Sequence, residues 1–156
     1  MNEQYAEKIV GFPLFQGFTL AGARMLLDYG EVKEYAVEEV LFKEGDLPTV
    51  VLLVLTGKMQ VFVERQGREM VLTDVGPGTI LGELALLCGI PRCASVRTSE
   101  RSAALQWSAT AFRHMLLGNV SLSERIFKES LRTLIDKERS LIDTLTRSQG
   151  GGSQTG

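Results

Sequence analysis

The sequence predicts a mainly β domain with helices before and after it. Apolar residues recur at helical spacing in residues 5–30 and again from Ala109 onward. Between these segments, residues 35–107 consist of short β-branched or apolar runs separated by turn residues. Such runs are typical of antiparallel strands, and periodicity alone leaves a sandwich, a jelly roll and a barrel open.

The first segment predicts short N-terminal helices. Thr19 stands where an N-cap is expected, before an apolar run that ends in Met25, Leu26 and Leu27. Gly30 follows this run as the expected helix stop.

The middle segment predicts a chain of strands. The run after the Thr56-Gly57-Lys58 turn has the period of a half-buried strand. One face carries Met59, Val61 and Val63, and the other carries Gln60, Phe62 and Glu64. The Gln66-Gly67-Arg68 corner follows, so this run predicts a hairpin with the next strand. The turns that separate the strands read Glu44-Gly45-Asp46, Thr56-Gly57-Lys58, Gln66-Gly67-Arg68 and Gly76-Pro77-Gly78.

The last segment predicts C-terminal helices over residues 109–148. Ser121-Leu122-Ser123-Glu124 has the capping-box pattern, which marks the start of the longer helix. That helix would be roughly 40 Å long at a rise of 1.5 Å per residue, more than a small β domain needs as cover. The glycine-rich residues 150–156 predict a flexible tail, so residues 1–149 are expected to form one domain.

One face of the long helix is apolar. Its residues follow steps of four and three, and Glu138 interrupts the row. The proximal part is expected to pack against the domain itself, and Leu134 to Leu145 to pair two chains as a homodimer. The row, which we call the helix seam, consists of Phe127, Leu131, Leu134, Leu141 and Leu145.

The charge and hydropathy of the chain argue against two classes of partner. The 17 basic and 19 acidic residues give a net charge of -2, so no diffuse positive field draws the chain onto nucleic acid. No apolar run reaches the roughly 20 residues that span a bilayer, and the polar N-terminus does not resemble an export signal. We expect a cytoplasmic protein with no nucleic-acid or membrane partner.

Catalytic and metal sites are not expected. Cys88 and Cys93 lie five residues apart, a spacing typical of neither a metal-ligand pair nor a disulfide framework, so reduced thiols are expected. Cys88 and Trp107 are both expected in the core, with Trp107 under a helix. The single His114 cannot build a histidine-rich metal site, and no pattern indicates an activated nucleophile. The sequence therefore predicts a binding protein without a cofactor, not an enzyme.

The segment Gly78–Val96 carries the most chemical information. Gly82 allows the backbone to approach a ligand closely, and a helical turn that starts near Glu83 would present amides to an anion. Arg92 supplies a planar, permanently charged donor fork that suits two phosphate oxygens. Glu83 can accept a hydrogen bond from a sugar hydroxyl. Together these groups predict a site for a sugar phosphate.

The same residues resemble the cyclic nucleotide-binding domain family. The family's phosphate-binding cassette reads Gly-Glu-Leu-Ala-Leu, followed by Pro-Arg, one variable residue and Ala. Gly82–Leu86 and Pro91–Ala94 match this pattern, and we call Gly82–Ser95 the cassette. The flanking runs that also resemble the family are Leu41–Asp46, Thr56-Gly57 and Gly76–Gly78.

The resemblance, which covers roughly residues 10–147, implies an eight-stranded β jelly roll (a double-stranded β-helix) with helices before and after it. It implies that Glu83 binds the ribose 2′-hydroxyl and Arg92 the cyclic phosphate. The amides of Ala85 and Cys93 would complete the phosphate site. The remaining residues implied in the ligand site are Gly82, Leu84 and Ala94 in the cassette and Val61, Leu72 and Thr73 along the base.

Two residues bear on ligand choice. The family often has Ser, Thr or Ala at the position of Cys93, where a hydroxyl is associated with bonding to phosphate or guanine. A thiol is a poor donor, so cAMP is slightly favoured over cGMP. Glu138 is expected near the purine, where either the ligand's exocyclic amine or the neighbouring Lys137 or Arg139 would be its partner.

The resemblance leaves two functions open. The first is a sensor in which the C-terminal helix moves when a cyclic nucleotide binds, and the signal passes to an unknown protein effector. No helix-turn-helix, kinase or channel pattern follows in this sequence. The alternative is a ligand-free interaction or assembly module, in which Arg92 forms a salt bridge with Glu83 instead of binding phosphate.

Overall fold

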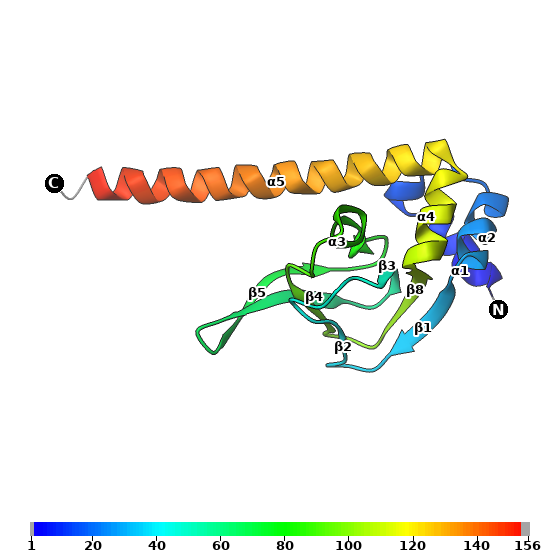
Figure 1. The fold of residues 1–156 in the computed structure, drawn as a ribbon, viewed down its shortest axis with the longest axis horizontal. Helices are drawn as coiled ribbons and strands as arrows, with labels where there is room; N and C mark the ends of the chain where they lie inside the picture. The colour runs from blue at the N-terminus through cyan, green and yellow to red at the C-terminus, as the bar shows by residue number, and fades with distance from the viewer. Residues whose placement is uncertain (1, 154–156) are drawn as a thin grey trace. The chain divides into compact units, whose positions relative to one another are not determined.

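The computed structural model describes residues 2–153 of the chain. Its residues group into two compact units, Met1–Val120 and Ser121–Gly156. Among the described residues, the first unit contains the strands and the shorter helices, and the second contains the long helix α5 from Ser121 onward (Figure 1).

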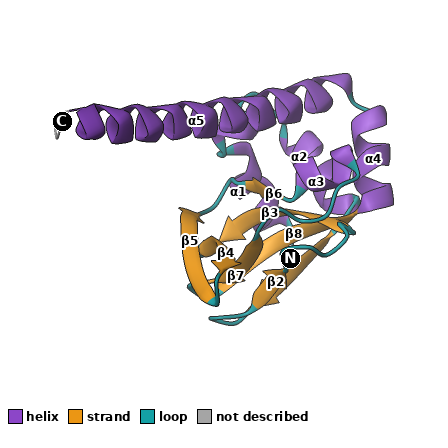
Figure 2. Ribbon diagram, turned by 60° about the vertical axis from the view of Figure 1, so that its left-hand side comes forward, coloured by secondary structure: helices purple, strands orange, loops and turns teal. Residues whose placement is uncertain are grey.

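Within residues 2–153, eight strands form two antiparallel four-stranded sheets (Figure 2). The strand orders are β1-β8-β3-β6 and β2-β7-β4-β5, and this arrangement confirms the predicted jelly roll with flanking helices. The helices of the first unit are α1 (Glu3–Val10), the 3₁₀ turn η1 (Pro13–Phe15), α2 (Leu20–Asp28), α3 (Glu83–Cys88) and α4 (Ala109–Leu117). The strands are β1 (Glu31–Tyr35), β2 (Val40–Phe42), β3 (Val50–Thr56), β4 (Met59–Arg65), β5 (Arg68–Val75), β6 (Ile80–Leu81), β7 (Ser95–Thr98) and β8 (Ser102–Ser108).

Strand β3 is apolar along its length because it is buried on both faces. Leu52 and Val54 belong to the core between the two sheets. The other face of this sheet is covered by the helices α1 and α4, and Trp107 of β8 is fully buried there. The Trp107 indole donates a hydrogen bond of 2.9 Å to the carbonyl of Leu26 in α2, which confirms the prediction that it packs under a helix. The core between the sheets consists of Phe42, Leu52, Val54, Met59, Leu81, Val96 and Ala104.

The N-terminal segment agrees in part with the prediction from the sequence. Thr19 caps α2, and its side-chain oxygen accepts a hydrogen bond of 3.1 Å from the amide of Gly22. The helix ends at Asp28, and Gly30 follows its C-cap as predicted, with its amide donating to the Leu27 carbonyl at 3.2 Å. A Cβ atom at Gly30 would also overlap the carbonyl of Gln106. Strand β1 starts at Glu31, four residues before the predicted strand region. It is an edge strand with charged residues, so it lacks the apolar pattern on which the prediction depended.

The β4–β5 hairpin differs from the predicted alternation, because Phe62 is buried and Val61 is only partly buried. Gln66 and Gly67 adopt left-handed conformations and form its two-residue turn. The register pairs Val61 with Thr73 but Phe62 with Val71, so β5 contains an extra residue, Leu72, at a β-bulge. Phe62 was expected on the less buried face but is buried, because the guanidinium of Arg97 covers its ring at 4.4 Å from the centroid.

Helix α5 extends over Val120–Ser153, five residues past its predicted end near Ser148. Residues 154–156 of the predicted flexible tail lie outside the described residues. The side chains of the helix seam (Phe127, Leu131, Leu134, Leu141 and Leu145) are 45–61% exposed. In the part of the chain that the structure describes, no helix is both long and apolar enough to cross a membrane.

Candidate ligand-binding site

The cassette begins with a close contact between Gly82 and Arg92. Gly82 precedes α3 with a φ of 87°, the left-handed conformation that only glycine adopts without strain. A Cβ atom at this position would overlap the guanidinium of Arg92 and lie 2.8 Å from the ring of Phe42. Gly82 is therefore required both by its backbone conformation and by the arginine beside it.

The side chain of Arg92 is held by two backbone carbonyls and an aromatic ring. Its Nη1 donates to the Gly82 oxygen at 2.9 Å, and its Nη2 donates to the Val50 oxygen at 2.6 Å. The guanidinium lies 3.7 Å from the centroid of the Phe42 ring. Arg92 is only 6% exposed, yet these bonds use two of the five N–H donors of its guanidinium.

The backbone of Arg92 is held as firmly as its side chain. Its amide donates to the Asp46 carbonyl at 2.8 Å, and its carbonyl accepts from the Gly45 amide at 2.8 Å. Both partners belong to Lys43–Asp46, the turn between β2 and β3. We call these four residues the Arg92 turn.

The electrostatics around Arg92 combine burial with nearby carboxylates. Burial lowers the pKa of the Arg92 guanidinium, while the charges of Glu83 and Asp46 act in the opposite direction and raise it. A guanidinium is not deprotonated in proteins, so Arg92 is charged at neutral pH. The site therefore holds a permanent, nearly buried positive charge beside the start of α3.

The predicted residues of α3 lie at its first turn. The Leu86 amide donates to the Gly82 carbonyl at 3.4 Å, which places the Ala85 amide before the intrahelical ladder begins. Ala85 is buried, whereas Glu83 and Leu84 are partly exposed. This geometry leaves the Ala85 amide in a position typical of an anion contact.

The residues after Arg92 include an exposed thiol. Cys93 is exposed, and its Sγ makes a weak contact of 3.9 Å with the Pro91 carbonyl. Ala94 is half-buried. Cys88 was expected in the core, but this prediction is wrong, because Cys88 is the last residue of α3 and is exposed beside the left-handed Gly89.

The predicted base-lining residues gather at the β-bulge of the β4–β5 hairpin. Val61 lies opposite Thr73 in the register, and Leu72 is the extra residue next to Thr73. Val61 is partly buried against the core, whereas Leu72 is 54% exposed and Thr73 is exposed. Val61 also lies opposite Val96 of β7, so the hairpin and the cassette are carried by neighbouring strands.

Glu138 is the one predicted site residue that belongs to the second unit. It lies on α5 and its side chain is exposed. A contact between Glu138 and a purine stays a prediction.

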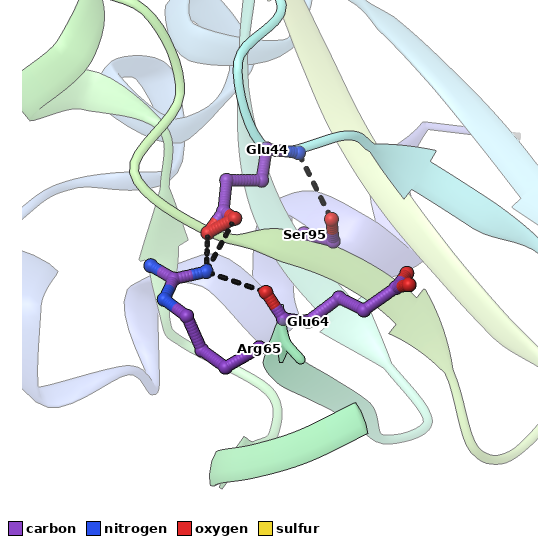
Figure 3. A network of polar contacts seen from close by, with 4 residues as sticks. All are labelled: Glu44, Glu64, Arg65 and Ser95. Atoms are coloured by element: carbon purple, nitrogen blue, oxygen red, sulfur yellow. Dashed lines mark hydrogen bonds and ion pairs between the residues drawn. The ribbon is translucent and has the colours of Figure 1, made fainter. Parts of the chain in front are cut away.

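Sequence reasoning missed four residues that build the site. Phe42 lies under the Arg92 guanidinium, and Val50 binds it through a backbone oxygen that no side-chain pattern indicates. Glu44, in the Arg92 turn, accepts from Arg65 through its carboxylate and donates to the Ser95 hydroxyl through its amide (Figure 3). The run Leu41–Asp46 had indicated that this region matters, but not the role of any residue in it.

Comparisons with known proteins agree with this geometry. The family model described as the cyclic nucleotide-binding domain matches residues 32–119, more than half of the chain. The cAMP-dependent protein kinase regulatory subunit of Blastocladiella emersonii is 32% identical over 100 residues, which cover 64% of this chain and 25% of that protein. The chain thus spans about a quarter of the length of that curated relative.

Two solved structures share the fold. The catabolite activator protein of Thermus thermophilus superimposes with a TM-score of 0.77 at 27% identity, covering 86% of this chain and 63% of that one. A cyclic nucleotide-binding domain from Methylobacillus flagellatus gives a TM-score of 0.73 at 26% identity, and the match covers 89% of this chain and 81% of that one. With the matching family model and the cassette geometry, these similarities show that the chain belongs to the cyclic nucleotide-binding domain family.

Proposed function

We propose that this chain is a sensor that binds a cyclic nucleotide in the cassette, with cAMP slightly favoured over cGMP. The observation that carries the proposal is the position of Arg92. Its permanent charge is fixed 2.9 Å from the Gly82 carbonyl, at the point where α3 begins. A cyclic phosphate at that point would meet a charged donor fork and the amides of the first helical turn.

Each cassette residue has a role in this proposal. Arg92 and the amides of Ala85 and Cys93 bind the cyclic phosphate, and Glu83 accepts a hydrogen bond from the ribose 2′-hydroxyl. Gly82 permits the close approach of Arg92, as its contacts indicate. Leu84 and Ala94 complete the wall of the site.

The base is proposed to lie along the hairpin. Val61, Leu72 and Thr73 contact it from β4 and β5, where the β-bulge exposes an apolar side chain. The Cys93 thiol is a poor donor to a guanine, which is the reason for the slight preference for cAMP.

The output of the sensor is proposed to be movement of α5. A ligand can shift the position of a helix only if it has different affinities for the two states. The exposed helix seam supports pairing with a second copy of the chain or with a protein effector, since a row of apolar residues at heptad spacing is typical of a coiled coil. The named relative is a regulatory subunit, and we likewise propose a regulatory role in the cytoplasm and no enzymatic activity.

One observation favours a second candidate, the ligand-free interaction or assembly module. Arg92 already donates to two carbonyls and is nearly buried, so its charge is partly satisfied within the fold. In this alternative, Arg92 serves to hold α3 against β3. The family fold is then retained without affinity for a nucleotide.

Isothermal titration calorimetry with cAMP and cGMP separates the two functions. The sensor predicts saturable binding of one nucleotide per chain, with cAMP the tighter ligand. The assembly module predicts no saturable heat for either nucleotide at concentrations up to the millimolar range. Recovery of unchanged nucleotide after incubation tests the absence of enzymatic turnover.

A further inference from the structure

The distal part of the β4–β5 hairpin extends past the neighbouring strand. Strand β4 is paired with β7 from Met59 to Phe62, and the pairing with β5 continues beyond it to Arg65 and Arg68 at the turn. Figure 1 shows this hairpin projecting from the rest of its sheet. Beyond Phe62, β4 has no paired residue on β7, so side-chain contacts near the turn join this distal part to the rest of the unit.

One such contact joins the hairpin to Glu44. The Nη1 of Arg65 donates to both carboxylate oxygens of Glu44, at 2.6 and 2.9 Å, and to the carbonyl of Glu64 at 2.7 Å (Figure 3). The Glu44 side chain is 28% exposed, about half as much as that of Arg65 at 59%. The pair therefore joins a projecting hairpin to a residue that is itself better enclosed.

Glu44 belongs to the turn that fixes Arg92. The next two residues, Gly45 and Asp46, hydrogen-bond the carbonyl and the amide of Arg92. The amide of Glu44 itself donates to the Ser95 hydroxyl at 2.9 Å, at the end of the cassette. A displacement of Glu44 would thus be transmitted to Arg92 through two backbone hydrogen bonds.

We propose that Glu44 is a positioning residue for Arg92. Through Arg65, it joins the end of the hairpin that carries Leu72 and Thr73 to the turn that hydrogen-bonds the backbone of Arg92. The ligand's base and phosphate are covalently linked, so a fixed spacing between the two contacts reduces the ordering cost of binding. This inference rests on the proposed function.

The size of the expected effect follows from the exposure of the pair. Part-exposed ion pairs contribute modestly, so loss of the Glu44 charge is expected to weaken cAMP binding about two- to fivefold. The effect should be a change in affinity of the folded protein and not a loss of folded protein.

The experiment compares Glu44→Gln and Arg65→Gln with a matched control, Glu3→Gln. Glu3 forms an equivalent ion pair with Arg24, but it joins α1 to α2 and touches neither the hairpin nor the Arg92 turn. Calorimetric titration with cAMP should show weaker binding in the Glu44 and Arg65 variants and unchanged binding in the control. The double variant Glu44→Arg/Arg65→Glu, which restores the pair with reversed charges, should recover most of the affinity.

Glu44→Gln is also tested in a protein that already carries a substitution at Arg92. This comparison separates positioning of Arg92 from general stabilisation of the fold. If Glu44 acts by positioning the Arg92 side chain, Glu44→Gln should have little further effect in an Arg92→Ala protein, which has no charged side chain left to position. An equal loss in both backgrounds would overturn the inference, as would parental affinity in Glu44→Gln. Absence of cAMP binding in the parent protein would overturn the proposed function itself, and this inference with it.

Discussion

The guanidinium of Arg92 lies over the ring of Phe42, 3.7 Å from its centroid, and bonds the carbonyls of Gly82 and Val50. Arg92 thereby links the start of α3 to the strands β2 and β3. It has a structural role in the fold in addition to its proposed role in binding phosphate. Substitutions at Arg92 should therefore change both the stability and the affinity of the protein.

Arg92→Ala should lower cAMP affinity about 10- to 100-fold or more, because charge-assisted hydrogen bonds contribute about 1.5–3 kcal/mol. It should also lower the free energy of unfolding by about 1–3 kcal/mol, since two carbonyls lose their donor. Calorimetry and urea unfolding measure the two effects. Glu83→Gln should cost less, mainly against ligands that carry a ribose 2′-hydroxyl. An Arg92→Ala protein that titrates like the parent would contradict the phosphate role.

Gly82→Ala should destabilise the protein more than Gly89→Ala. Both glycines have a positive φ, so each substitution carries a backbone cost of about 1–2 kcal/mol. At Gly82 the new methyl group also meets Arg92 and Phe42, whereas at Gly89 nothing lies within 4 Å. Displacement of these neighbours should add about 1–3 kcal/mol, measured by urea unfolding. Equal losses at both positions would show that Arg92 is not held as described.

Leu134→Glu together with Leu141→Glu should convert a dimer into monomers if the helix seam pairs two chains. Each substitution would place a charge in an apolar contact, which is unfavourable without a partner. Thr133→Glu with Ser140→Glu, which adds the same charges one residue away from each leucine, is the matched control and should leave the dimer intact. Sedimentation velocity measures the outcome. A parent that is monomeric at micromolar concentration would refute the paired seam.

Glu138→Leu should selectively weaken binding of cAMP if the carboxylate accepts from the exocyclic amine of adenine. Cyclic IMP lacks that amine, so its affinity should not change. Competition titrations with both nucleotides measure the difference. Equal losses of affinity for both nucleotides, or no loss, would remove Glu138 from the ligand site. Its carboxylate would then pair with Lys137 or Arg139, or set the register of the helix pair.

The arrangement of the candidate site could be predicted in part because it depends on particular residue types at fixed spacing. Gly82 and Arg92 were expected to act together, and the structure places them in hydrogen-bond contact. The cap at Thr19 could likewise be predicted from one side chain and its place before an apolar run.

Other features could not be predicted, for physical reasons. Val50 binds Arg92 with a backbone carbonyl, which every residue carries, so no residue type marks it. The bulge at Leu72 adds one residue to a strand and leaves no compositional sign. Strand β1 is a charged edge strand and lacks the apolar alternation of the others.

The most direct test of the central claim is NMR observation of the Arg92 Nε–H group during a cAMP titration. The resonance is assigned by its loss in Arg92→Lys. If the guanidinium receives the cyclic phosphate, the Arg92 resonance should shift as cAMP is added and saturate at the same concentration as the calorimetric binding curve. An Arg92 resonance that stays unchanged while cAMP binds, or a protein that binds no cAMP, would contradict the account.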